Sequence, residues 1–252
     1  MMSMRFPLQL LAAVVLSTAL QAADKNPNVL FIAIDDQNDW IGYLGGHPMA
    51  KTPHIDRLAR RGTAFTNAHC QAPLCNPSRT SLMTGMRPST TGIYGLSPWF
   101  RTVPELKDLV TLPQYLKQHG GYTTYSTGKI YHGRYEYPAD WHDFKTTGDA
   151  RNRQWRTKPV SSVPGIRVRD FGPIDLPEEQ FGDLINARWA AGQLKRDFGR
   201  PFFMAVGIRL PHVPLYAPRR FFERHPEKQV KLPVVREDDL ADLPPAGLQI
   251  TE

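Results

Sequence analysis

The sequence has no basic, aromatic-rich stretch of the kind with which proteins bind nucleic acid. Its 31 lysine and arginine residues exceed its 24 aspartate and glutamate residues and give a net charge of +7. These basic residues are scattered, and no run of them alternates with aromatic side chains that could stack on bases. The net charge still favours polyanionic partners. We therefore expect an anionic partner that is not a nucleic acid.

Internal repeats and low-complexity segments are also missing. Hydrophobic residues make up 41% of the chain and charged residues 22%, which are ordinary values for a globular protein. The length of 252 residues is enough for one substantial α/β domain or two small ones. The composition therefore predicts a folded globular protein.

The apolar run near the N-terminus is too short to be a comfortable membrane span. It extends from Leu8 to Leu20 after a single basic residue, Arg5, and small residues follow it. This pattern is typical of a secretory signal peptide, which we place at residues 1–23. An uncleaved anchor is the alternative. Cleavage would leave residues 24–252 as an exported protein, periplasmic or extracellular, without a stable membrane span.

The chain has only two cysteines, Cys70 and Cys75. Export would place them in a compartment where disulfides can form. One interpretation is therefore a structural disulfide bond between the two cysteines in a turn. A reactive role for one of them requires that it escape this pairing.

The stretch after Cys75 has the residues of a helix start. Pro77 and Ser78 suit a first helical turn, and Gly85 can end a short helix in a left-handed conformation. Cys75 would then lie just before the helix N-terminus, where backbone amides and the helix dipole favour negative charge. Arg79, one turn on, could point at the same spot. Such a cysteine is either a reactive thiol or the precursor of a group that handles an anion.

Two adjacent carboxylates follow the first apolar stretch of the mature chain. Residues Asn28 to Ile34 predict a parallel strand buried on both faces, and it ends directly in Asp35 and Asp36. Two such carboxylates repel each other and are costly to bury without a cation. A hard divalent metal with oxygen ligands removes both problems. The alternative is that one aspartate caps the following turn.

Two further predicted strands also end in ionisable residues. Residues Tyr122 to Ser126 are followed by a turn that contains Lys129 and His132, and residues Pro201 to Ile208 are followed by His212. The carboxyl ends of parallel strands meet at one edge of a sheet, where ligands bind. These three side chains are therefore expected beside the two aspartates, although each could be an ordinary surface or loop residue.

The remaining segments are predicted from their periodicity and end signals. They are helices over Thr52–Gly62, Leu112–Gly120 and Gly182–Phe198, and a short strand over Thr63–His69. Residues 135–176 have no clear periodicity, and we expect an elaborated loop region over the sheet's carboxyl edge.

Together these motifs resemble those of the type I sulfatases. The signature is Cys75-x-Pro-Ser-Arg79 followed by Thr-Gly, and the Asp pair, Gly-Lys-x-x-His and Pro-His-x-Pro elements occur in the same order. The combination looks most like the iduronate-2-sulfatase branch and its bacterial relatives. The resemblance implies an α/β fold of the alkaline-phosphatase or sulfatase type, a mixed sheet sandwiched between helices, truncated at its C-terminal side.

The resemblance also implies a mechanism. A formylglycine-generating or sulfatase-maturing enzyme would oxidise Cys75 to formylglycine, and Asp35, Asp36 and residue 75 would hold calcium, with magnesium as an alternative. Arg79 and Lys129 would neutralise oxyanion charge. His212 would protonate the leaving oxygen, and His132 would deprotonate the second hydroxyl of the hydrated aldehyde. The substrate would be a sulfated carbohydrate.

One element of the family pattern is not found. Sulfatases carry a downstream Asp-His-Gly or Asp-Asn-Gly element that completes the metal site, and nothing after His212 matches it. We therefore expect residues 24–252 to be the N-terminal part of a sulfatase catalytic domain. Two other functions stay open at this point: a phosphonate or phosphodiester hydrolase of the same superfamily, and a non-catalytic truncated remnant that binds anions.

Overall fold

The computed structural model describes residues 26–133, 136–145, 160–161 and 170–251. The predicted signal peptide lies outside these residues. In the described part of the chain, no helix has the length and hydrophobicity that a membrane crossing requires. The chain divides into two compact units. The first comprises the described parts of Met1–Asp35, His69–Ala150 and Glu179–Arg209, and the second those of Asp36–Ala68, Arg151–Glu178 and Leu210–Glu252.

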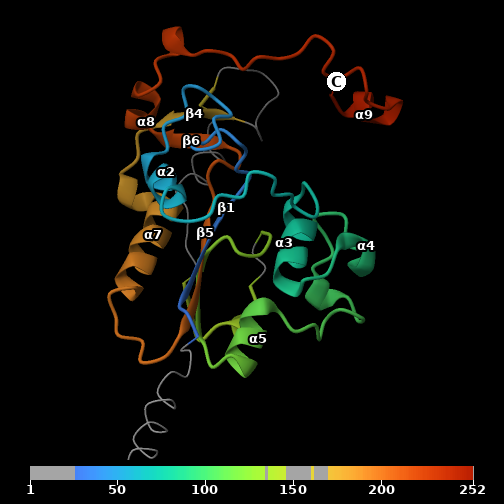
Figure 1. The fold of residues 1–252 in the computed structure, drawn as a ribbon, viewed down its shortest axis with the longest axis vertical. Coiled ribbons are helices and arrows are strands. Elements are labelled where there is room, and N and C mark those ends of the chain that lie inside the picture. Colours follow the sequence, from blue (N-terminus) through green and yellow to red (C-terminus); the bar gives the residue numbers. More distant parts are fainter. Residues whose placement is uncertain (1–25, 134–135, 146–159, 162–169, 252) are drawn as a thin grey trace, which may run out of the picture. The chain divides into compact units, whose positions relative to one another are not determined.

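The first unit is built on a parallel sheet of four strands in the order β1-β5-β2-β3 (Figure 1). The strands are β1 (Val29–Ile34), β2 (Thr123–Gly128), β3 (Asp143–Lys145) and β5 (Phe202–Ile208). The sequence predicted three of these strands to within two residues. The predicted α/β fold is confirmed. The sheet was expected to be mixed, and the strand pairs that the structure describes in it are all parallel, so that these strands end at one edge.

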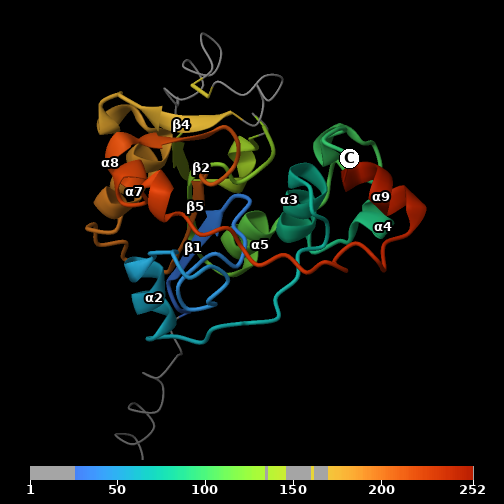
Figure 2. The same ribbon diagram turned by 90° about the horizontal axis from the view of Figure 1, so that it is seen from above.

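Strand β5 lies in the interior of this sheet and is buried on both faces, as its apolar sequence predicts. Phe203 and Ala205 point into a core with Met83 of helix α3, whereas Met204 and Val206 point into a second core. Helix α7 (Gly182–Gln193) covers that second face, and α3 (Cys75–Thr84) and α5 (Leu112–His119) lie on the opposite side (Figures 1 and 2). The layers are those of an α/β sandwich.

The prediction that β1 is buried on both faces is wrong. Among the described strands β1 lies at an edge of the sheet, and its residues alternate between half-buried and exposed. Leu30 is 43% and Ile32 50% exposed, whereas Phe31 packs against the first core. A continuous apolar run does not distinguish an edge strand from a central one, because both faces can be apolar in either case.

Helix α5 of the first unit begins and ends at the predicted signals. Thr111 and Gln114 form a capping box before α5, and Gly120 follows its last residue. Helix α7 ends at Gln193, five residues earlier than predicted. The remaining short elements are α4 (Pro88–Thr91), η1 (Phe100–Thr102) and η2 (Pro138–Asp140).

The second unit contains a two-stranded parallel sheet and short helices. Its elements are α2 (Pro53–Ala59), β4 (Phe171–Ile174), β6 (Leu215–Pro218), α8 (Arg219–Glu223), η5 (Glu227–Gln229) and α9 (Pro245–Thr251), and η4 (Glu178–Gln180) lies at its boundary. The buried carboxylate of Asp170 accepts hydrogen bonds from the amides of Val160 and Ser161 and from the Tyr216 hydroxyl. These bonds fix the start of β4.

Two predictions for the irregular segments are wrong. Residues 63–69 form no strand and are exposed, because only Phe65 among them is a large hydrophobic residue and it stays 75% exposed. Residues 135–176, expected to be loop throughout, contain β3 and β4. Both strands are four residues or shorter, too short to show a period in the sequence.

Candidate active site

Cys75 is the first residue of helix α3, with Leu74 in extended conformation as its N-cap. The helix therefore begins slightly earlier than Pro77 and Ser78 indicated, and Cys75 lies within its first turn rather than before it. Gly85 ends the helix in the left-handed conformation, with φ of 72°, as predicted. The thiol stands where the unpaired amides of the first turn favour negative charge.

Arg79, one turn after Cys75, is buried and holds three acceptors. Its Nη1 donates to the carbonyl oxygens of Lys129 at 2.6 Å and Ile130 at 2.8 Å, and its Nη2 donates to Asp35 Oδ1 at 2.6 Å. The planar guanidinium can donate in this forked arrangement, which the ammonium group of a lysine could not reproduce. Helix α3, the end of β1 and the loop after β2 are thereby joined at one point.

Asp35 is 4% exposed, and its carboxylate is shared by two cations. Arg79 binds one oxygen and the Lys129 ammonium binds the other. Burial by itself would raise the pKa of Asp35, but the charges and hydrogen bonds of Arg79 and Lys129 outweigh it and hold this pKa below its usual range. Asp35 is therefore ionised in the folded protein at neutral pH.

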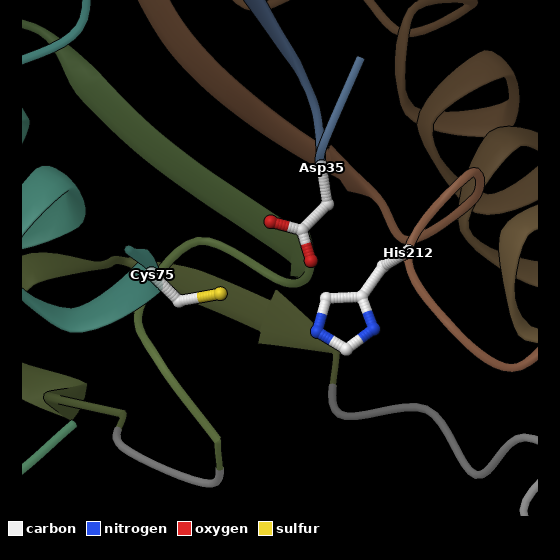
Figure 3. Close-up of side chains that lie close together, drawn as sticks. All are labelled: Asp35, Cys75 and His212. Atoms are coloured by element: carbon white, nitrogen blue, oxygen red, sulfur yellow. The ribbon is translucent and has the colours of Figure 1, made fainter. Parts of the chain in front are cut away.

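Lys129 also connects this ion pair to the cysteine. Its Nζ lies 3.4 Å from the sulfur of Cys75. The sulfur and the Asp35 carboxylate lie within 4.8 Å of each other, and Figure 3 shows them pointing toward one another. The first unit thus brings together four of the predicted site residues: Asp35, Cys75, Arg79 and Lys129.

Two glycines let the Lys129 loop approach the neighbouring strand. Gly128 has φ of 76°, and a Cβ on it would clash with the carbonyl oxygen of Gly207 on β5. A Cβ on Gly207 would clash in turn with the Lys129 backbone. The Lys129 amide lies 3.3 Å from the Gly207 oxygen as a result. Any larger side chain at either position would move the lysine.

Asn186 of helix α7 is a positioning residue that the sequence did not reveal. It is buried, it accepts a hydrogen bond from Thr127 Oγ1 at 2.9 Å, and its amide donates to Gly207 at 3.4 Å. It therefore ties α7 to the ends of β2 and β5. A lone asparagine inside a helix carries no signal that marks it for this role.

His132 and Cys70 complete the predicted residues of the first unit. His132 is half-buried and lies in the bend that follows β2. Cys70 is exposed and Cys75 half-buried, and no disulfide joins them. The interpretation of the two cysteines as a structural pair is not supported.

The other two predicted residues, Asp36 and His212, belong to the second unit. His212 Nε2 lies 4.0 Å from the Asp36 carboxylate, a separation at which a protonated imidazole forms an ion pair. Its Nδ1 lies 2.5 Å from the Val213 carbonyl oxygen, which suits an N–H at that nitrogen. Asp36 has φ of 57°, a left-handed conformation that is uncommon outside glycine.

The geometry of the first unit suits chemistry on an anion. A cysteine at a helix N-terminus, a guanidinium and an ammonium meet within one hydrogen-bonded cluster. The helix N-terminus and the two cations each stabilise negative charge that develops nearby. The model of the sulfatase family matches residues 27–233, which include all of these side chains.

The chain belongs to the sulfatase family. It is 36% identical over 249 residues to a sulfatase of Formosa agariphila, with 90% of this chain and 47% of that protein covered. It is 31% identical to human iduronate 2-sulfatase, with 81% of this chain and 38% of that enzyme covered. The sequence-based prediction of this family is confirmed. The chain spans less than half the length of these relatives.

Solved structures support the same fold. A 2-O GAG sulfatase aligns with a TM-score of 0.51 and 25% identity, covering 73% of this chain and 35% of that one. A phosphonate monoester hydrolase of Agrobacterium radiobacter aligns with a TM-score of 0.59 and 19% identity, covering 79% and 44%. The second likeness concerns the fold alone. The predicted alkaline-phosphatase-like architecture of the sulfatase chain is thereby confirmed.

Proposed function

We propose that the protein is an exported sulfuric ester hydrolase that removes sulfate from a sulfated carbohydrate, and that this chain supplies the N-terminal part of its catalytic domain. The observation that carries the proposal is the cluster in which Cys75 and Asp35 share the Lys129 ammonium while Arg79 holds the same carboxylate. It occurs in a chain of the sulfatase family whose relatives include iduronate 2-sulfatase. Residues 1–23 are proposed as the export signal.

Residue 75 is proposed as the nucleophile after a sulfatase-maturing enzyme converts it to formylglycine, whose hydrate supplies the attacking hydroxyl. We propose that Arg79 and Lys129 stabilise the negative charge of the sulfate oxygens, and their contacts with Asp35 and Cys75 support this role. In the same proposal His212 donates a proton to the leaving alcohol oxygen. His132 accepts a proton from the second hydroxyl of residue 75.

Calcium, or magnesium in its place, fits the donor chemistry of Asp35 and Asp36. Hard cations prefer carboxylate oxygens, and each oxygen of Asp35 keeps a lone pair beyond the hydrogen bond that it accepts. We propose that Asp35, Asp36 and residue 75 hold this ion, which would supply further positive charge at the sulfate. Calcium takes about six to eight oxygens, so we expect the 252-residue chain by itself to bind it weakly.

Maturation is tested by peptide mass spectrometry of protein produced together with a formylglycine-generating enzyme. An aldehyde is expected at residue 75 and none at residue 70. The matched control is Cys70→Ser, which should be modified at residue 75 as the parent chain is. A disulfide between the two cysteines in every molecule would refute the proposal.

The reaction is tested with 4-nitrophenyl sulfate beside 4-nitrophenyl phosphate and a phenyl phosphonate ester. Faster turnover of the sulfate ester is expected, with activity abolished in Cys75→Ala. Preference for either phosphorus ester would assign the protein to the phosphonate and phosphodiester hydrolases that share this fold. The assay and a calorimetric calcium titration are run on the 252-residue chain and on a version extended with its downstream sequence. Equal sulfatase rates and equal calcium affinities in the two versions would show that this chain holds the complete site.

A further inference from the structure

The loop after β2 carries two residues of the proposed chemistry, Lys129 and His132, and Tyr131 stands between them. Tyr131 is 5% exposed, and its ring lies in the first core, with its centre 6.2 Å from that of the Phe100 ring. Its hydroxyl donates a hydrogen bond to the carboxylate of Asp140 in η2. Burial and the neighbouring carboxylate raise the pKa of this hydroxyl, so it keeps its proton and stays a donor. The loop is therefore tied to η2 at the residue between its two functional side chains.

Asp140, the partner of this tyrosine, is held at several points. It is fully buried, and its second carboxylate oxygen accepts a hydrogen bond from Thr111 Oγ1 at 2.9 Å, while the Arg101 guanidinium lies 4.0 Å from that oxygen. Its carbonyl oxygen accepts a bond from the Thr124 hydroxyl of β2 at 2.8 Å. Burial raises the pKa of Asp140, and the hydrogen bonds from Tyr131 and Thr111 oppose that rise. A buried acceptor with several fixed donors keeps one orientation, so it defines where the tyrosine hydroxyl can lie.

Arg79 holds the same loop through its backbone. The carbonyl oxygens of Lys129 and Ile130, the two residues before Tyr131, both accept hydrogen bonds from its Nη1. Arg79 and Lys129 also bind the sulfate in the proposed reaction, so their contacts have to change when the substrate arrives. The bond between Tyr131 and Asp140 lies among buried residues, where the substrate does not compete for it. Such a buried support keeps the geometry of a loop with catalytic side chains.

We propose that Tyr131 and Asp140 are positioning residues for the reaction: the hydrogen bond between them sets where the loop after β2 lies, and with it where Lys129 and His132 meet the substrate. All four residues belong to the first unit. The inference rests on the proposed function and adds two residues to it. Neither of them touches the sulfate ester in this proposal, and their effect on the reaction passes through the loop.

Tyr131→Phe tests the proposal, because it removes the hydroxyl and keeps the ring. The matched control is Tyr122→Phe: Tyr122 stands at the other end of β2, is 7% exposed and donates its hydroxyl to the Pro27 carbonyl oxygen at 2.9 Å. Each variant loses one buried hydrogen bond, so both should have a lower urea midpoint than the parent. In the full-length protein matured at residue 75, kcat for 4-nitrophenyl sulfate should fall about tenfold in Tyr131→Phe and stay unchanged in Tyr122→Phe, with KM within about twofold of the parent value.

Asp140→Asn and Asp140→Ala test whether the support is the hydrogen bond itself. The asparagine amide can accept from the Tyr131 hydroxyl and donate to Thr111 Oγ1, since a hydroxyl takes either role. We expect Asp140→Asn to keep kcat within about threefold of the parent value, and Asp140→Ala to lose at least as much as Tyr131→Phe. The double variant Asp140→Ala with Tyr131→Phe should lose no more than Asp140→Ala alone, because both changes remove the same bond. An Asp140→Asn enzyme as slow as Asp140→Ala, or additive losses in the double variant, would contradict the proposal.

Chemical labelling of Lys129 tests the loop without turnover, on the 252-residue chain before maturation. Its side chain is 11% exposed, so an amine-acetylating reagent should modify it slowly, whereas the exposed Lys107 should react fast. Peptide mass spectrometry should show Lys129 acetylated about tenfold faster in Tyr131→Phe than in the parent or Tyr122→Phe, with Lys107 unchanged.

The possible failures are distinguishable. A matured parent that hydrolyses no sulfate ester would contradict the proposed function, and the labelling of Lys129 then still tests the support of the loop. An active parent in which Tyr131→Phe and Tyr122→Phe have equal kcat would contradict the positioning role. Equal acetylation rates of Lys129 in the parent and both variants would overturn it as well.

Discussion

Asp35 and Glu136 are both withdrawn from water in the first unit, but of these two carboxylates only Asp35 forms ion pairs with the described residues. Arg79 and Lys129 bind its two oxygens, and its pKa is lowered in spite of burial. Burial raises the pKa of Glu136 instead. A carboxylate that the fold already pairs organises a site, whereas one that it leaves unpaired is available to a ligand.

Removing the charge of the paired carboxylate should have the largest effect. Asp35→Asn leaves the guanidinium of Arg79 and the ammonium of Lys129 buried without their counter-ion. We expect the free energy of unfolding to fall by about 3–5 kcal/mol, measured by urea denaturation at pH 7. Asp108→Asn, at an exposed aspartate of the same unit, should change it by less than about 0.5 kcal/mol. Equal effects of the two substitutions would show that Asp35 is not the centre of the cluster.

Lys129 and Lys145 allow the same comparison between a paired and an unpaired charge among the described residues. Lys129→Met removes one of the two partners of Asp35 and should cost about 2 kcal/mol in unfolding free energy. Lys145→Met removes an ammonium that the described structure leaves unpaired, and a change below about 0.5 kcal/mol is expected. Thermal unfolding of both variants shows which substitution lowers stability more. A larger loss of stability in Lys145→Met than in Lys129→Met would contradict our assignment of the paired and unpaired cations.

The pH dependence of stability should have opposite signs at the two carboxylates. The pKa of Asp35 is lower in the folded state, so its stabilisation is present above the pKa of the unfolded chain and is lost as the pH falls through the folded value. The destabilisation of Asp35→Asn should therefore shrink on acidification. Urea denaturation between pH 7 and pH 3 measures this, and a constant difference would contradict it.

Glu136→Gln should have the smallest effect on the free energy of unfolding, and it should stabilise the protein rather than destabilise it. Its folded pKa is raised, so its contribution favours folding below the unfolded pKa and is lost as the pH rises through the folded value. Glu136→Gln should then be slightly more stable than the parent at pH 7, by less than about 0.5 kcal/mol, and equal to it near pH 3. Glu105→Gln serves as the control at both pH values. A destabilised Glu136→Gln at pH 7 would mean that the carboxylate has a partner within the protein.

Local sequence signals predicted the elements that hold the site. The apolar run of β5, the proline near the start of α5 and the glycine after α3 each depend on residues within or next to one element, so these patterns can be recognised without the rest of the chain. The family motifs placed Cys75 and Arg79 one helical turn apart. Their spacing alone indicated that both would face the same point.

Contacts between distant segments decided the rest. Asp35 meets Lys129 across 94 residues, and the close approach of Gly128 to Gly207 becomes visible only when β2 and β5 are paired. The sequence of β1 predicts a central strand, but among the described strands β1 lies at an edge, because burial depends on which elements pack beside the strand. The sequence by itself therefore determined the family and, to within two residues, the positions of strands β1, β2 and β5. Only the tertiary structure decided which charges neutralise each other and which, at Glu136 and Lys145, have no ion pair among the described residues, since pairing is a property of distance in space.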